Sequence, residues 1–345
     1  MSMKKVDSAG LESWVQLLIK DHTVYGVQAK EDRFAFDSLE DAADLRLDYD
    51  VTILPPKKYL QPQKEVLLTF DQNGCFESVM NKESFIIFGV HPYDMVAISQ
   101  MDKVFTMDNR DEHYMAYRER ATIVVSDVQK ASQDVFAGCM GTSGGKDCEG
   151  HDVLLTLLPD GNTLVEAKTE NGEALISKIP SALDASELDV QSRTAVWEEN
   201  HHALKKHELR MSPKDLPELL DRSYDHPIWE EKAALCYSCG SCNMVCPTCY
   251  CFNIQDDLNW DLQSGTRSRC WDGCMVSGFA KVAGNHDFRP QAAARYRHRY
   301  YRKGKYVPDM MGEIACVGCG RCITSCTAKI ANPVEVYNRL LEDVR

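Results

Sequence analysis

Cysteine dominates one stretch of the sequence, which reads Cys236-Tyr-Ser-Cys239-Gly-Ser-Cys242-Asn-Met-Val-Cys246-Pro247. The same spacing returns near the C-terminus as Cys316-Val-Gly-Cys319-Gly-Arg-Cys322-Ile-Thr-Ser-Cys326. Both runs follow C-x2-C-x2-C-x3-C, the pattern that wraps a [4Fe–4S] cubane in small bacterial ferredoxins. Where two such runs occur, the first three thiolates of a run bind one cluster and the fourth binds the other. The sequence therefore predicts two [4Fe–4S] clusters.

This crossed ligation divides the eight cysteines into two sets of four. The first predicted ligand set is Cys236, Cys239, Cys242 and Cys326. The second is Cys316, Cys319, Cys322 and Cys246. Structural zinc is the alternative, since zinc ribbons also use pairs of cysteines separated by two residues. A tetrahedral zinc site has no use for the regularly placed Cys242 and Cys322, so the spacing favours iron–sulfur clusters.

The segment inserted between the runs, residues 247–315, contains four further cysteines: Cys249, Cys251, Cys270 and Cys274. In an extended strand, the first two would point the same way. The last two would share a face if residues 269–275 were helical. Two interpretations stay open, a third metal site made by these four thiols and a set of buried thiols packed beside the two clusters.

The same insertion contains a strongly basic segment, residues 288–308, with seven arginines or lysines, four tyrosines and no acid. Basic and aromatic residues also alternate on surfaces that bind single-stranded nucleic acid. The net charge of −13 argues against nucleic acid as a partner, because phosphate binding needs a dominant basic face. We instead expect these cations to lie near anionic clusters, where they would raise the cluster potentials and help an acidic partner subunit to bind. The alternative is a solvated helix face with inward tyrosines.

The half of the chain before the cysteine runs alternates between strand and helix patterns. Apolar runs at 85–90 and 122–125 predict buried strands, with a helix opening at Met95 and capped by Asp94 between them. Residues 11–19 have helical spacing, with Asp7 or Ser8 as the cap, and 153–158 should pair with 163–166 in a hairpin. We therefore expect an α/β (α+β) domain with a partly parallel sheet over residues 1–215. Residues 216–345 should form a mostly helical, ferredoxin-like dicluster domain.

Residues 138–150 are rich in glycine but match neither a phosphate-binding loop nor a dinucleotide fingerprint. We interpret them as a mobile loop. No flavin or nicotinamide site is visible in the sequence, and no catalytic acid and base stand out as a pair. These patterns predict a protein that carries electrons and depends on other subunits for two-electron chemistry.

Composition places the chain among ordinary globular proteins, with 44% hydrophobic and 26% charged residues. No stretch approaches the roughly 20 consecutive apolar residues of a membrane helix, and the N-terminus lacks the apolar core of a signal peptide. Thiolate ligands require a reducing environment. We therefore expect a cytoplasmic protein of an anaerobic organism, without a membrane span.

Longer motifs extend beyond the cysteine spacing. Residues 236–252, 271–275, 282–290 and 316–322 resemble a family of iron–sulfur electron-transfer subunits, typified by the iron–sulfur subunit of anaerobic sulfite reductase and the β subunit of cytosolic [NiFe] sulfhydrogenases. Residues 88–94 and 140–142 share this resemblance more weakly. The resemblance implies a relay between a flavin-containing subunit that oxidises NAD(P)H or ferredoxin and a terminal hydrogenase, sulfite reductase or heterodisulfide-reductase-type subunit.

The predicted function is thus that of a non-catalytic electron-transfer subunit of an anaerobic oxidoreductase. Two alternatives belong to other classes. One is a zinc-stabilised nucleic-acid-binding module. The other is a reductase with its own substrate site, over which residues 138–150 would close.

Overall fold

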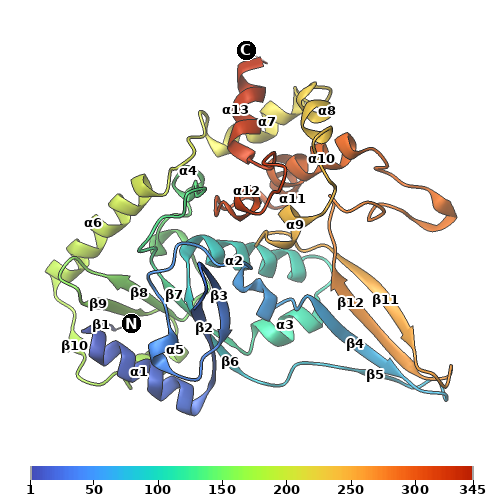
Figure 1. Cartoon of the computed structure of the whole chain (residues 1–345). Coiled ribbons are helices and arrows are strands. Elements are labelled where there is room, and N and C mark those ends of the chain that lie inside the picture. Colours follow the sequence, from blue (N-terminus) through green and yellow to red (C-terminus); the bar gives the residue numbers. More distant parts are fainter. Residues whose placement is uncertain (1, 344–345) are drawn as a thin grey trace.

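An eight-stranded mixed sheet forms the base of the molecule in the computed structural model, which describes residues 2–343 (Figure 1). Its strand order is β10-β1-β9-β8-β7-β6-β2-β3. The strands are β1 (Met3–Val6), β2 (Thr23–Lys30), β3 (Arg33–Ser38), β6 (Phe85–Val90), β7 (Ala121–Ser126), β8 (Val153–Leu157), β9 (Thr163–Ala167) and β10 (Leu183–Asp184). Strands β2, β6, β7 and β8 are parallel, and β8 and β9 form the expected hairpin. The prediction of a partly parallel α/β layer is confirmed.

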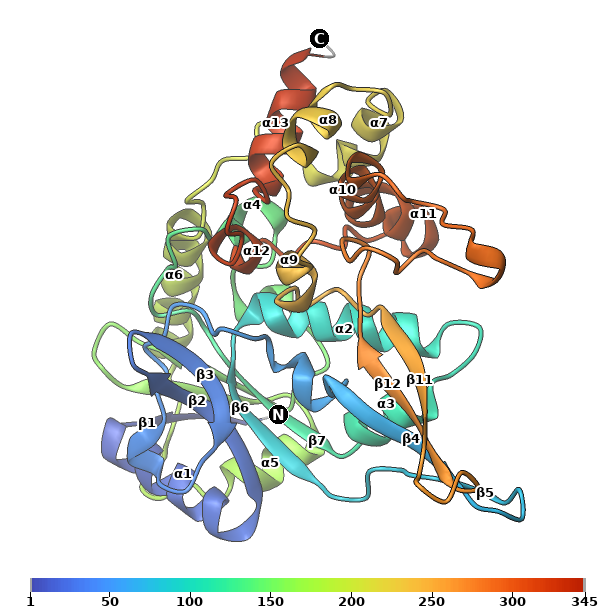
Figure 2. The same cartoon turned by 45° about the vertical axis from the view of Figure 1, so that its right-hand side comes forward.

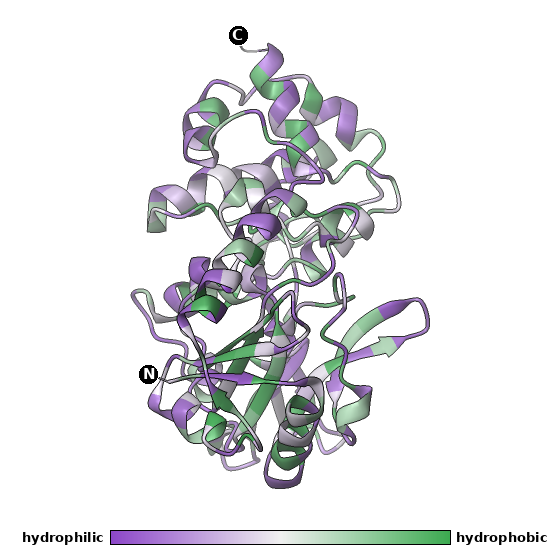
Figure 3. Cartoon of the chain, turned by 90° about the vertical axis from the view of Figure 1, so that its left-hand side faces the viewer, coloured by the Kyte–Doolittle hydropathy of each residue, from purple (hydrophilic) through white to green (hydrophobic). Residues whose placement is uncertain are grey.

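Helices cover both faces of this sheet because the central strands are apolar on both sides. Against one face pack α1 (Ser8–Asp21) and α5 (Glu170–Ile176), and against the other α2 (Pro92–Thr106) and α3 (Glu112–Arg118). Alternation along β6 sends Phe88 to the first core and Ile87 to the second, and both are fully buried. Figure 3 shows the hydrophobic strands at the centre of this part.

The two predicted helix starts differ in outcome. The cap of α1 is Asp7, one of the two predicted candidates, and its carboxylate accepts a hydrogen bond from the backbone N–H of Gly10. The predicted cap of α2 is wrong. That helix begins at Pro92 with His91 as its N-cap, because proline suits the first helical turn, and Asp94 is completely buried within the first turn.

A second sheet joins segments that are far apart in the sequence. Its order is β11-β12-β4-β5, with β4 (Lys64–Phe70) and β5 (Phe76–Ser78) from the first half and β11 (Phe252–Leu258) and β12 (Gly265–Trp271) from the insertion. The buried Arg269 on β12 binds Glu65 on β4 and Asp111 at the start of α3. The insertion therefore anchors the two halves of the chain to each other, and the expected mostly helical character of residues 216–345 is not confirmed. The boundary at 215/216 stays a prediction.

Short helices surround the cysteine runs in the upper part of Figure 1. They are α7 (Leu216–Asp221), α8 (Ile228–Ala233), α9 (Ser241–Met244), α10 (Ala292–Tyr301), the π-helical turn η6 (Arg302–Tyr306), α11 (Val307–Met311), α12 (Arg321–Thr324) and α13 (Pro333–Asp343). Their core contains Trp229, Tyr296, Tyr300 and Leu340. Figures 1 and 2 both show α2 lying between the large sheet and the helices α9 and α12.

The remaining elements are α6 (Glu187–Ala203), α4 (Ala137–Met140) and the 3-10 turns η1 (Ala42–Asp44), η2 (Pro56–Tyr59), η3 (Gly145–Asp147), η4 (Pro213–Asp215) and η5 (Ala283–Asn285). Residues 138–150, predicted to be a mobile loop, include α4 and η3 and are packed over much of their length. Thr142 and Ser143 are buried, and the Thr142 hydroxyl donates to the carbonyl of Val317 in the second cysteine run. None of the helices between residues 2 and 343 has the length and hydrophobicity of a membrane span.

Candidate metal centres

Two cavities gather the eight cysteines of the two runs. Cavity A is lined by Cys236, Cys239, Cys242 and Cys326. Cavity B is lined by Cys246, Cys316, Cys319 and Cys322. These are the two sets of four that the spacing predicts, with one thiol in each set crossing from the other run. That these eight cysteines bind clusters stays a prediction.

Left-handed residues curl each run around its cavity. Gly240 (φ 75°) and Gly320 (φ 78°) precede the short helices α9 and α12, and the positive φ reverses the chain there. Gly318 (φ 69°) also has no room for a side chain, since a Cβ would lie 2.6 Å from the backbone nitrogen of Ala137. The second run therefore lies directly against the segment that leads into α4.

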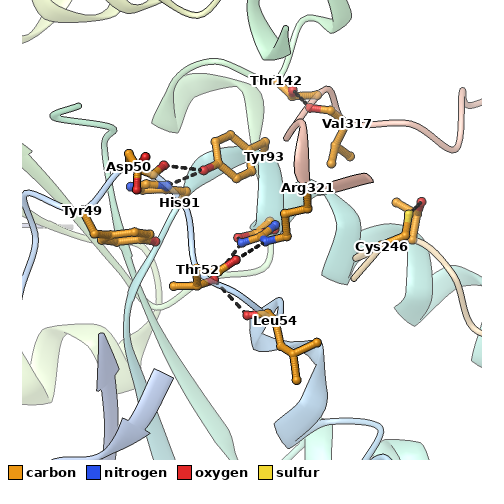
Figure 4. A network of polar contacts seen from close by, with 12 residues as sticks. Tyr49, Asp50, Thr52, Leu54, His91, Tyr93, Thr142, Cys246, Val317 and Arg321 are labelled. Carbon is orange, nitrogen blue, oxygen red and sulfur yellow. Dashed lines mark hydrogen bonds and ion pairs between the residues drawn. The ribbon is translucent and has the colours of Figure 1, made fainter. Parts of the chain in front are cut away.

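A buried ion pair between Arg321 and Asp94 fixes the second run to the N-terminal half. Figure 4 shows the neighbouring contact of Arg321 with Thr52. Arg321 lies between the last two cysteines that its own run contributes to cavity B, and its guanidinium donates two hydrogen bonds of 2.6 Å to the Asp94 carboxylate. It also donates to the carbonyl and hydroxyl of Thr52. All three residues are at most 3% exposed. Because both ends of this bidentate pair are shielded from water, it sets the position of α12 against α2.

Buried cations lie beside cavity B. The Lys303 ammonium donates to the Cys246 sulfur at 3.1 Å, to the Thr248 hydroxyl at 2.8 Å and to the Ala315 carbonyl at 3.2 Å. Arg299 also lines this cavity and is 1% exposed, and its Nε and Nη2 atoms have no hydrogen-bond partner among residues 2–343. Two cations of the basic segment, Arg299 and Lys303, are therefore buried. The alternative of a purely solvated helix face is wrong. The proposed binding of an acidic partner stays a prediction.

The thiol pKa values reflect this environment. Burial raises the pKa of Cys242 to about 12 and that of Cys316 to about 11. The pKa of Cys246 lies well below its ordinary value, because Cys249 donates a hydrogen bond to its sulfur and the Lys303 ammonium is adjacent. Burial lowers the pKa of Lys303, but the neighbouring sulfurs of Cys246 and Cys249 outweigh burial and raise it well above its ordinary value. Negative charge is thus stabilised at Cys246, beside Lys303, whereas burial disfavours it at Cys316.

The four cysteines of the insertion separate into three and one. Cys249, Cys251 and Cys274 line a further cavity, cavity C, whereas Cys270 does not. The predicted helix at residues 269–275 is wrong, since β12 continues to Trp271 and Cys274 follows in a turn. The predicted strand is also wrong, because Cys249 and Cys251 precede β11 in irregular backbone.

Sequence reasoning missed several residues at these sites. Asp94 was expected as a helix cap, although the arginine inside a cysteine run was a signal that a buried acid should exist elsewhere. Lys57 lies on η2, is 2% exposed, and its ammonium donates to the carbonyl of Cys249. No local pattern marks Lys57, because its partner lies in the insertion, 192 residues further along the chain.

The chain is similar to known iron–sulfur proteins. Residues 235–330 match the family described as 4Fe-4S dicluster domain. Over 324 residues the chain is 32% identical to the protein named Sulfhydrogenase 2 subunit beta of Pyrococcus furiosus, covering 93% of this chain and 92% of that protein. The chain belongs to the sulfhydrogenase β-subunit family. This confirms the resemblance drawn from the motifs.

For this member of the sulfhydrogenase β-subunit family, the dicluster match begins just before Cys236 and ends shortly after Cys326. It therefore contains both cysteine runs and the whole insertion. The chain is an iron–sulfur protein of the electron-transfer type, and the zinc interpretation of the two runs is overturned. The residues around cavities A and B fit such clusters, since each cavity offers four thiols and cavity B adds buried cations.

Proposed function

We propose that this chain relays single electrons through two [4Fe–4S] clusters in a multi-subunit oxidoreductase. Cavity A would hold one cluster through Cys236, Cys239, Cys242 and Cys326, and cavity B the other through Cys246, Cys316, Cys319 and Cys322. A bound cluster supplies one-electron redox chemistry. The observation that carries this proposal is the crossed grouping of eight thiols around two cavities.

The surroundings of the two cavities suggest different tasks. Cavity A lies near the surface, since Cys239 is exposed and the neighbouring Tyr237 is 74% exposed. Cavity B is more enclosed, with Cys319 buried and the charged groups of Arg299 and Lys303 beside it. Positive charge favours the reduced form of a centre, so an electron entering at cavity A would move toward cavity B.

We infer the partners by analogy with a relative. The relative in Pyrococcus furiosus is named as the beta subunit of a sulfhydrogenase. By analogy, this chain would connect a flavin-containing subunit that oxidises NAD(P)H or ferredoxin with a terminal hydrogenase or reductase subunit. Alone, it should transfer electrons to artificial dyes but lack two-electron turnover.

Anaerobic purification with iron and acid-labile sulfide analysis tests the proposal. We expect at least about eight irons and eight sulfides per chain and reduced-state EPR signals from interacting cubanes. Cys242→Ser should disturb one cluster, whereas Cys75→Ser, at an exposed cysteine outside all three cavities, should leave iron and spectra unchanged. A protein that contains zinc and no labile sulfide would refute the relay.

A second candidate function has one observation in its favour. A cleft is lined by residues 138–142, by Gln100 and Lys103 on α2, and by Cys316. A substrate in this cleft would lie beside Cys316, a proposed cluster ligand in cavity B. This position supports the alternative of a reductase with its own substrate site. Steady-state turnover by the isolated chain with a low-potential viologen as electron donor would favour this alternative.

A further inference from the structure

Cavity C brings three thiols together from two separate segments. Cys249 and Cys251 follow the first cysteine run, and Cys274 lies in the turn after β12. The amide of Asn243 lies between them, with its Nδ2 atom 3.6 Å from the Cys249 sulfur and 3.5 Å from the Cys274 sulfur. The backbone N–H of Met275 donates to the Asn243 Oδ1 atom and so fixes which end of the amide faces the sulfurs. Such N–H donors to sulfur are typical of iron–sulfur sites.

The three thiols surround a space and do not meet at a point. All three thiols line cavity C, as four thiols line each of cavities A and B. Among residues 2–343, no three His, Cys, Asp or Glu side chains are arranged to hold a single metal ion, and this applies equally to cavities A and B. Cavity C therefore resembles cavities A and B in having its thiols spread around a space, but it has three thiols where each of the others has four.

Charge supplies an independent argument for an anion at cavity C. A cubane with a 2+ core and four thiolates would carry a net charge of 2−, which Arg299 and Lys303 would balance at cavity B. Two more cations lie around cavity C, Arg302 in its lining and Lys57 above the Trp271 ring at 4.2 Å. Lys57 is buried and pairs with no carboxylate among the described residues; its ammonium instead donates to the Cys249 carbonyl. A buried cation requires a compensating negative charge.

One further ligand is available in the lining. His298 on α10 borders cavity C, and its ring makes no hydrogen bond or ion pair with residues 2–343, only an aromatic contact with Tyr306. Cys270 is the alternative from the sequence, but it lies on β12 outside the cavity, with its sulfur 3.5 Å from the Gln255 Oε1 atom. Imidazole nitrogen replaces thiolate in some iron–sulfur centres.

We propose that cavity C holds a third [4Fe–4S] cluster, bound by Cys249, Cys251 and Cys274 with His298 as the fourth ligand. This inference rests on the proposed function, because the third cluster would extend the same relay. Thr248, Arg299 and Lys303 line both cavity B and cavity C, so the two centres would be neighbours. Cavity B would then exchange electrons with both of the other centres.

Iron and sulfide analysis of the full-length protein, purified without oxygen, tests this proposal directly. We expect about twelve irons and twelve sulfides per chain, and three one-electron reductions in a dithionite titration. The triple variant C249S/C251S/C274S should retain about eight irons and lose one of the three reductions. C270S is the matched control and should retain all twelve.

The outcomes separate the third cluster from the relay itself. About eight irons in the wild type, unchanged in the triple variant, would overturn the third cluster and leave the two-cluster relay intact. Iron near zero in the wild type would overturn the relay as well. For the fourth ligand, H298A should lose the third centre or change its EPR signal, and H298C should restore a cubane signal. Loss of the centre in C270S with no change in H298A would overturn the assignment of His298.

Discussion

Replacing Lys303 by methionine tests whether the buried ammonium sets a redox potential. Its Nζ atom lies 3.1 Å from the sulfur of Cys246, a proposed ligand in cavity B, and methionine preserves most of the side-chain volume. At an effective dielectric constant of about 20, two unit charges about 5 Å apart interact by about 3.3 kcal/mol. For a one-electron couple this corresponds to about 140 mV. The positive ammonium stabilises the electron that a reduced cluster in cavity B would carry. Removing the ammonium should therefore lower the reduction potential of that cluster by about 140 mV.

An EPR-monitored anaerobic redox titration measures the shift. Lys305→Met is the matched control, since Lys305 lies two residues further along the chain and pairs with Asp221 and Asp309 near the surface. We expect Lys303→Met to lower one couple strongly and Lys305→Met to move none by more than about 20 mV, because water screens exposed charges. Lys303→Arg should retain most of the wild-type potential. If Lys303→Met binds normal iron and every couple stays within about 30 mV of wild type, the electrostatic argument fails.

Three further perturbations probe the fold around the centres. Asp94→Asn leaves the Arg321 guanidinium buried without its carboxylate, so anaerobic urea titration should show a loss of about 3–5 kcal/mol in the free energy of unfolding; a loss below about 1 kcal/mol would contradict a structural role for the pair. Gly318→Ala would place a Cβ 2.6 Å from the Ala137 nitrogen, and the purified variant should contain about four irons per chain fewer than the wild type. The control Gly312→Ala is also at positive φ but in open space, and it should retain the wild-type iron content. Burial lowers the pKa of His151 from 6.5 to about 4. As the pH falls from 6.5 toward 4, the imidazole therefore binds a proton in the unfolded chain but not in the folded one, and the folded state loses stability. Between pH 7 and 5.5 the wild type should therefore lose about 1 kcal/mol more than His151→Asn, and equal losses would refute this assignment.

Local patterns in the sequence were sufficient for the two cysteine runs and for much of the α/β layer. Cluster ligation depends on the spacing of neighbouring residues, so the runs at 236–246 and 316–326 predicted which thiols share a cavity. The β8–β9 hairpin and the Asp7 cap of α1 are local in the same sense. Strand periodicity and capping act over a few residues, which is why these elements could be recognised before the fold was known.

Only the tertiary structure decided which of the inserted cysteines share a cavity. Cys270 is one of four similar candidates in the sequence, and its position on β12, paired with β4, removes it from the other three. The acid that neutralises Arg321 lies 227 residues earlier, and the cation beside Cys249 lies 192 residues earlier. A charged side chain that is buried away from water needs a neighbouring group that compensates its charge, and the fold can supply that group from a distant part of the sequence. Spacing along the chain contains no information about those distant contacts, so the local sequence predicted the thiol runs and the packing of the two halves determined their electrostatic surroundings.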